Sequence, residues 1–110
     1  MIDTIYNAIP NELFINYMDS LTNRVFKILP MKDDKDKTVD TYISSLLFEM
    51  TGEQELIVFL KNDRRYMTVL NKLQGLLNDD SNYRGVIFDC LSDIGVLKQR
   101  YCKGRDTNAN

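Results

Sequence analysis

The segment Asp34–Ser45, DKDKTVDTYISS, has oxygen-bearing side chains spaced as at the start of a calcium-binding loop. They occur at alternate positions, at Asp34, Asp36, Thr38 and Asp40. An EF-hand loop also needs glycine at its sixth position and a bidentate glutamate at its twelfth. Those positions hold Val39 and Ser45, and a β-branched valine resists the left-handed backbone of that turn. We therefore do not expect this segment to bind calcium.

The same stretch is better interpreted as a solvated loop between two helices. Pro30 should end the preceding helix, and the following MKDDKDK carries three acidic and three basic side chains in seven residues. Asp36 or Thr38 can cap a helix that begins near Val39. The sequence therefore predicts a helix start here.

The rest of the chain offers few residues for catalysis. It contains no histidine, which is the commonest general base and transition-metal ligand. The two cysteines, Cys90 and Cys102, are too few for a disulfide framework. Within one helix they would lie about 18 Å apart, too far for a bridge or a shared metal. The five glycines are isolated and form no phosphate-binding loop. We predict a protein that is not an enzyme and has no cofactor and no metal.

Length and composition indicate one globular domain. The chain has 110 residues, of which 44% are hydrophobic and 27% charged. We expect the domain to span residues 1–103, followed by a polar tail at 104–110. No apolar run approaches the length of a membrane span, and Asp3 without nearby basic residues does not resemble a signal peptide. The default expectation is a cytoplasmic protein that does not enter a membrane.

Apolar residues recur with helical spacing through nearly all of the sequence. The pattern predicts an all-α bundle of four to five principal helices with short loops. The expected helices are Asn11–Leu29, Thr38–Met50, Glu55–Asn62, Asp63–Leu77 and a last one from Ser81 that fades after Tyr101. Leu13, Tyr17 and Leu21 should face the core from the first of these. Gly52 is well placed to end the expected helix Thr38–Met50.

Two segments are ambiguous by pattern alone. Residues 1–9 favour either a short helix or an arm docked on the bundle. ELIVFLKN, residues 55–62, is an apolar run that suits a buried strand or a buried helical turn. We predict a helix there, because no second strand-like run exists to pair with a strand.

Several large apolar residues fall outside the expected core stripes of their helices. They are Ile15, Phe26, Phe48 and Phe88. Phe48 is the clearest, because it lies about opposite Val39 among hydroxyl-bearing neighbours. Such residues either contact neighbouring helices on a second side, or form an apolar surface for another chain, identical or different. This surface would include three N-terminal isoleucines if the first segment reaches outward, namely Ile2, Ile5 and Ile9.

Charge is distributed unevenly along the chain. Residues 1–55 carry 5 basic and 10 acidic side chains, and residues 56–110 carry 9 basic and 6 acidic ones. A basic cluster near the C-terminus comprises Lys98, Arg100, Lys103 and Arg105. It either complements the dipole of the last helix or binds an anionic partner. The net charge of −2 and pI near 5.0 argue against a dedicated nucleic-acid binder.

No run of residues matches a motif specific enough to name a family. The abundance of Asn, Ile, Lys, Asp and Tyr is typical of proteins from low-GC bacteria and their phages. We predict a small non-catalytic helical protein that binds other proteins, as an accessory subunit, inhibitor, immunity-type protein or self-associating regulator. The alternative is a nucleic-acid-associated regulator that uses the basic cluster.

Overall fold

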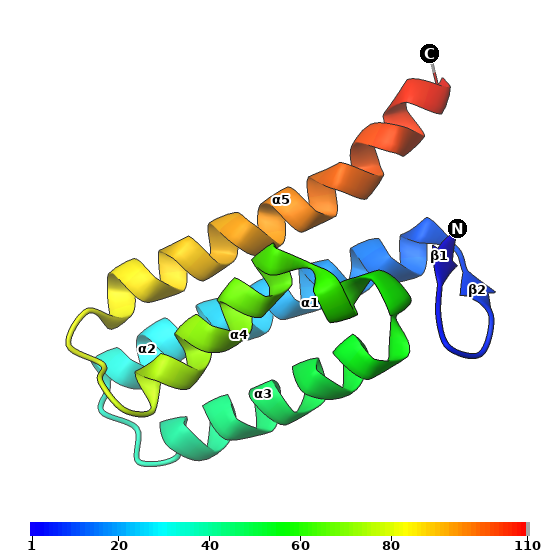
Figure 1. The fold of residues 1–110 in the computed structure, drawn as a ribbon. Helices are drawn as coiled ribbons and strands as arrows, with labels where there is room; N and C mark the ends of the chain where they lie inside the picture. The colour runs from blue at the N-terminus through cyan, green and yellow to red at the C-terminus, as the bar shows by residue number, and fades with distance from the viewer. Residues whose placement is uncertain (110) are drawn as a thin grey trace.

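The fold is a bundle of four long helices preceded by a small β-hairpin (Figure 1). The computed structural model describes the backbone of residues 1–109 and the side chains of residues 1–101. The elements in chain order are β1 (Ile2–Asp3), β2 (Ala8–Ile9), α1 (Asn11–Phe26), α2 (Ile28–Asp33), α3 (Val39–Leu56), the 3₁₀ helix η1 (Val58–Asn62), α4 (Arg64–Leu76) and α5 (Tyr83–Ala109). This confirms the predicted all-α bundle with short loops. No helix in the described part of the chain is long and apolar enough to cross a bilayer.

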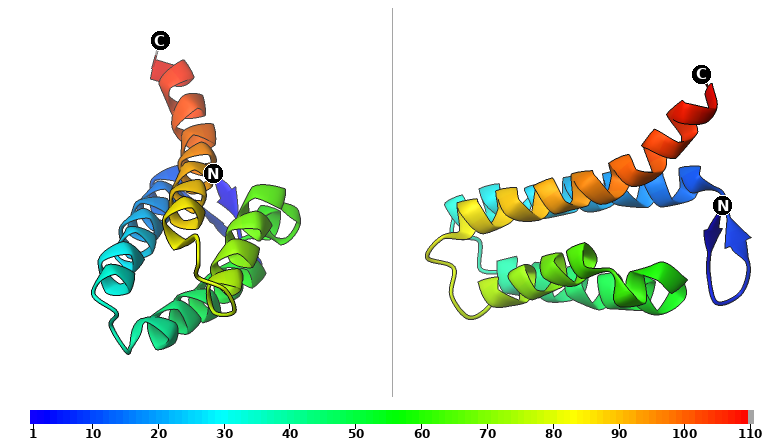
Figure 2. Two further views of the ribbon diagram at one scale, coloured as in Figure 1. Left: turned by 90° about the vertical axis from the view of Figure 1, so that its left-hand side faces the viewer. Right: turned by 45° about the horizontal axis from the view of Figure 1, so that its top comes forward.

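The helices form the four corners of the bundle. Helix α5 packs against both α1 and α4, whereas α3 packs mainly against α4 and η1. Figures 1 and 2 show α3 and α5 on opposite sides of the bundle, with α1 and α4 between them. One face of α3 therefore points away from the rest of the molecule.

The core is built from one apolar stripe on each long helix. On α1 the fully buried side chains are Phe14, Met18, Leu21 and Val25, a spacing that keeps them on one helical face. The prediction for the start of this stripe was wrong, because Leu13 is 53% exposed while its neighbour Phe14 is fully buried. The Phe14 ring contacts the rings of Phe59 and Tyr101 edge-on, and these aromatic contacts fix the rotation of α1.

The first helix is shorter than predicted. It ends at Phe26, and α2 begins at Ile28 with Pro30 as its third residue. Proline lacks the N–H that would bond to the Phe26 carbonyl and so interrupts a continuous helix. In the first turn of a new helix, however, backbone N–H groups have no intrahelical partner, so a proline there costs no hydrogen bond. Pro30 therefore separates two helices instead of ending one.

The N-terminal segment is a docked hairpin and contains no helix. Ile2 pairs with Ile9 across the antiparallel strands, and the side chain of Ile2 is buried in the core. The hydroxyl of Thr4 holds the turn, because it donates to the Asn7 carbonyl at 2.6 Å and accepts the Asn7 N–H at 3.0 Å. Pro10 disfavours helical backbone at Ile9, which leaves the segment extended.

Residues 55–62 are helical as predicted except at Ile57, where contacts with the hairpin break the single expected helix into the end of α3 and η1. Thr4 forms a β-bridge with Ile57, and the Ile5 N–H donates to the Leu56 carbonyl at 2.9 Å. Helix α3 continues through Gly52, so the prediction that this glycine ends the helix was wrong. It stops at Leu56, next to these contacts with the hairpin. After the extended Ile57 the chain forms η1. No strand-like pattern marks the partner of Ile57, because that partner is the single residue Thr4 in a short turn-rich segment.

The last helix extends beyond its predicted end. Its backbone remains helical from Tyr83 to Ala109, past Tyr101. The side chains from Cys102 onward lie outside the described residues. The domain end at residue 103 and the polar tail at 104–110 stay predictions.

Candidate interaction surface on helix α3

Phe48 is the most exposed large apolar side chain among the described residues, at 83%. It projects from α3 on the side opposite the core residues Ile43, Leu46 and Met50. A shallow depression of about 470 Å³ surrounds it, lined by Asp40, Thr41, Ser44, Ser45 and Phe48 itself. Farther along the helix, a Cβ added at Gly52 would contact nothing. We call the exposed residues of α3 from Asp40 to Glu55 the α3 outer face.

A groove between α1 and α3 adjoins this face. It has a volume of about 240 Å³ and is lined by Arg24, Tyr42, Ser45, Leu46 and Glu49. Ser45 lines both the groove and the depression around Phe48. The two hollows therefore form one continuous surface along α3.

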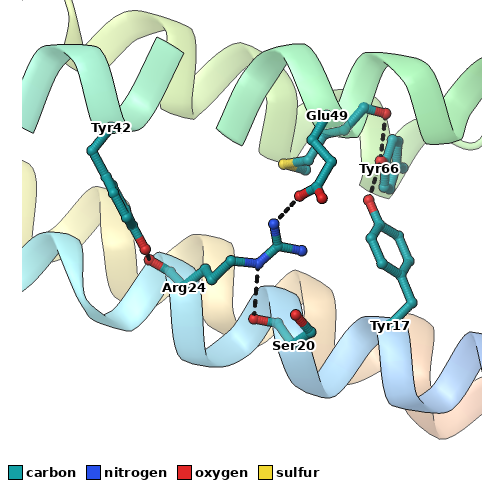
Figure 3. Close-up of polar contacts among 7 residues, drawn as sticks. Tyr17, Ser20, Arg24, Tyr42, Glu49 and Tyr66 are labelled. Atoms are coloured by element: carbon teal, nitrogen blue, oxygen red, sulfur yellow. Dashed lines mark hydrogen bonds and ion pairs between the residues drawn. The ribbon is translucent and has the colours of Figure 1, made fainter. Parts of the chain in front are cut away.

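Long polar side chains bridge the groove (Figure 3). The Arg24 guanidinium forms an ion pair with the Glu49 carboxylate and also donates to the Ser20 carbonyl at 3.4 Å. The Tyr42 hydroxyl donates to the Arg24 carbonyl at 2.8 Å. Because these side chains span the gap at its surface, α1 and α3 are held together while the groove between them stays open. Sequence reasoning missed this groove, since Arg24 and Glu49 are 25 residues apart and no periodicity links them.

Two hydrogen-bonded tyrosine hydroxyls, of the partly buried Tyr17 and the fully buried Tyr66, hold α3 in place from the inside. The Tyr66 hydroxyl donates to the Met50 carbonyl at 2.7 Å, and lies 3.0 Å from the Tyr17 hydroxyl, which donates to it (Figure 3). Burial raises the pKa of both tyrosines above the ordinary value. Both hydroxyls thus stay protonated at neutral pH, and their hydrogen bonds join α1, α3 and α4. The α3 outer face is presented on a fixed helix.

The other predicted phenylalanines lie elsewhere. Phe26 and Phe88 are 52% and 51% exposed. Phe26 lies one turn beyond Thr22 on α1, and Phe88 one turn before Ser92 on α5. Thr22 and Ser92 line a separate groove of about 480 Å³ between these two helices. The structure therefore places Phe26 and Phe88 along the α1–α5 side, away from Phe48, and the three phenylalanines do not form one patch.

The predicted isoleucines are divided between core and surface. Ile15 and Ile2 are buried, which corrects their assignment to an exposed surface, and Ile9 is partly buried against the core. Only Ile5 is exposed, because it lies in the turn of the hairpin. The pattern had shown these residues as apolar but gave no information about which side of the hairpin would dock.

The basic cluster is tied into the bundle where it can be described. Lys98 pairs with Asp19 of α1 at 2.6 Å, and Arg100 pairs with Asp63 at 2.8 Å. Asp63 also caps α4 by accepting the Tyr66 N–H at 3.0 Å. The side chains of Lys103 and Arg105 lie outside the described residues. The two described cations thus have partners within the chain.

The segment first compared with a calcium loop fixes the entry to α3. One oxygen of Asp36 accepts the Thr38 N–H at 2.8 Å and the Thr38 hydroxyl at 2.6 Å. These bonds lower the pKa of Asp36. Thr38 is the N-cap residue but its side chain makes no capping bond. Among the described residues, no three Asp, Glu, Cys or His side chains gather to hold a metal ion.

Comparisons with known protein families, with curated proteins and with solved structures gave no match to this chain. The function is therefore inferred from the geometry of the surface alone.

Proposed function

We propose that this protein is a small non-catalytic interaction module that binds another protein chain through the α3 outer face. The observation that carries the proposal is the 83% exposure of Phe48 on a helix whose opposite face is buried in the core. Covering a phenylalanine side chain contributes about 1.5–3 kcal/mol, and aromatic residues are enriched at the centres of protein interfaces. The neighbouring hydroxyl-bearing residues are short, so a partner can approach the helix closely.

The absence of catalysis is part of the proposal, and the chemistry of the titratable side chains supports it. The chain has no histidine to serve as a general base near neutral pH. Burial raises the pKa of Cys90 to about 12, so its thiol stays protonated and a poor nucleophile. The buried tyrosines have raised pKa values for the same reason. These groups belong to the core.

The nucleic-acid alternative is less well supported. A nucleic-acid surface presents cations that are available to phosphate groups. Here Lys98 and Arg100 each pair with an aspartate of the same chain, and the whole chain is acidic with a net charge of −2. An accessory subunit, inhibitor, immunity-type protein or regulator fits the exposed aromatic better.

The proposal is tested by affinity capture from cells of the source organism with the wild type and two variants. Phe48→Ala removes the anchor, whereas Met67→Ala removes a comparably apolar exposed side chain from α4. We expect a partner that co-purifies with the wild type and with Met67→Ala but is lost with Phe48→Ala. Equal recovery with all three proteins would show that the partner binds elsewhere.

A further inference from the structure

The charge of α3 differs from that of the other long helices. Its residues Val39–Leu56 include four acidic side chains and no lysine or arginine. The acids are Asp40, Glu49, Glu53 and Glu55. Helices α1 and α5 each carry both signs, and α4 carries bases only. Glu49 is paired with Arg24, and Glu55 with the exposed Lys61 at 3.5 Å. The surface around Phe48 is therefore apolar at its centre, with Asp40 toward one end of the helix and the exposed Glu55–Lys61 pair toward the other.

This charge pattern disfavours a second copy of the chain as the partner. A symmetric dimer formed through the α3 outer face would place α3 against α3. In an antiparallel arrangement centred on Phe48, Asp40 of one copy would lie near Glu55 of the other. In a parallel arrangement each acid would face its own equivalent. Both arrangements bring like charges together, which is unfavourable at an interface.

The α1–α3 groove indicates what shape the partner presents. Its lining includes the ring of Tyr42 and the side chain of Leu46, and its volume of about 240 Å³ is enough for one large apolar side chain. Because this groove runs beside Phe48 along α3, a second helix laid against α3 can place an apolar residue there and contact Phe48 one turn away.

From these observations, and resting on the proposed function, we infer that the partner of the α3 outer face is a basic amphipathic helix of a different protein. Its apolar stripe covers Phe48 and enters the α1–α3 groove. Its lysine or arginine side chains lie near Asp40 at one end and near Glu55 at the other, where they replace the exposed Lys61 as the ion-pair partner of Glu55. Complementary charge determines which helix binds, since the apolar contact alone would also permit self-association.

Two synthetic peptides serve as probes. Both contain about 18 residues, long enough for helix formation, and share one apolar stripe. One carries lysine and the other glutamate at the remaining positions. Each is titrated into isotope-labelled protein while backbone amide shifts are recorded. We expect the lysine peptide to bind about tenfold more tightly than the glutamate peptide, with shifts at Ser45 and Phe48.

Three variants locate the binding. Phe48→Ala should strongly weaken binding of the lysine peptide. The double variant Asp40→Asn with Glu55→Gln should remove most of its advantage over the glutamate peptide. Asp89→Asn removes an exposed acid from α5 and should change the affinity of neither peptide. Equal weakening by Asp89→Asn would mean that the peptide responds to net charge only and would overturn the inference.

The remaining outcomes separate this inference from the proposed function. Equal binding of both peptides at Phe48 would keep the interaction surface but overturn its selection by charge. A wild-type dimer in sedimentation equilibrium that becomes monomeric with Phe48→Ala would make a second copy the occupant, again overturning this inference alone. No shift on α3 with either peptide would also overturn it, while the capture experiment would still test the proposed function independently.

Discussion

The α3 outer face and the basic end of α5 lie on opposite sides of the bundle, and each is a candidate contact surface. On α5, Lys98 and Arg100 reach neighbouring helices and pair with aspartates. On α3, Phe48 remains 83% exposed. The difference follows from side-chain length and flexibility. A lysine or arginine on a helix can turn back to a partner in its own chain, whereas an aromatic ring that points outward from a fixed helix cannot.

This comparison shows which kind of sequence signal is informative about partners. A cluster of exposed charges is readily satisfied within the fold at little gain in free energy. An apolar residue among short polar ones has no such option, and its exposure depends only on the direction in which its helix faces. Substitutions at the two surfaces and in the core between them test this difference.

The largest effect should separate an inner from an outer phenylalanine. Phe14→Ala should lower the free energy of unfolding by about 3–5 kcal/mol, because it leaves a cavity in the core. Phe48→Ala should change it by about 0.5 kcal/mol or less, as expected for a surface substitution. Chemical denaturation of both variants measures the difference. A comparable loss for Phe48→Ala would show that its ring is covered by the chain's own residues.

The hydrogen-bonded hydroxyls of Tyr17 and Tyr66 should make the stability of the fold sensitive to alkaline pH. The pKa values of Tyr17 and Tyr66 are raised above 10.0 in the folded protein. Their contribution is fully present below pH 10.0 and is lost as the pH rises above it, because unfolded tyrosines ionise there while the folded ones do not. We expect Tyr17→Phe to make the loss of stability above pH 10.0 less steep.

At neutral pH the Tyr17–Tyr66 hydroxyl pair should have a smaller effect on the free energy of unfolding. Tyr66→Phe should cost about 1–3 kcal/mol, because it removes the hydroxyl that bonds to both the Met50 carbonyl and the Tyr17 hydroxyl. Equilibrium unfolding at pH 7 and above pH 10.0 measures both effects. An alkaline slope that is the same in Tyr17→Phe and the wild type would show that this pair does not fix α3.

The smallest effect should come from the basic end of α5. Lys98→Gln combined with Arg100→Gln removes two partly exposed ion pairs, and each should contribute about 1 kcal/mol or less. Unfolding measurements check this. A salt-dependent gel shift with DNA or RNA that the double variant weakens would instead favour the nucleic-acid alternative.

The helices could be predicted from the sequence, but their ends could not. Regular apolar spacing located all four long helices, since burial of one face is the main determinant of each. The ends depend on contacts between distant residues. Thr4 pairs with Ile57 and so decides where α3 stops, and neither residue has an unusual sequence context. Pro30 predicts a break in the helix, but its position in the first turn of α2 depends on how Ile28 and Leu29 are buried.

The candidate surface was predictable in one part and hidden in another. The exposure of Phe48 follows from the helical wheel, because a residue opposite a clean core stripe must face outward. The same reasoning was wrong for Ile15, which is buried, because α1 carries apolar residues over a wider arc. The α1–α3 groove depends on the distance between two helices, which Tyr42, Arg24 and Glu49 bridge and which no local sequence pattern specifies.

The central claim is that the α3 outer face contacts another protein, and a photo-crosslink at position 48 tests it most directly. Phe48 is replaced by a photoreactive benzoyl-phenylalanine in the native host, with Met67 and Phe88 replaced singly as controls on α4 and α5. After irradiation, we expect a covalent adduct with a different protein at position 48 and little at either control. The attached peptide should be rich in lysine or arginine. Adducts at position 88 with none at position 48 would contradict the account.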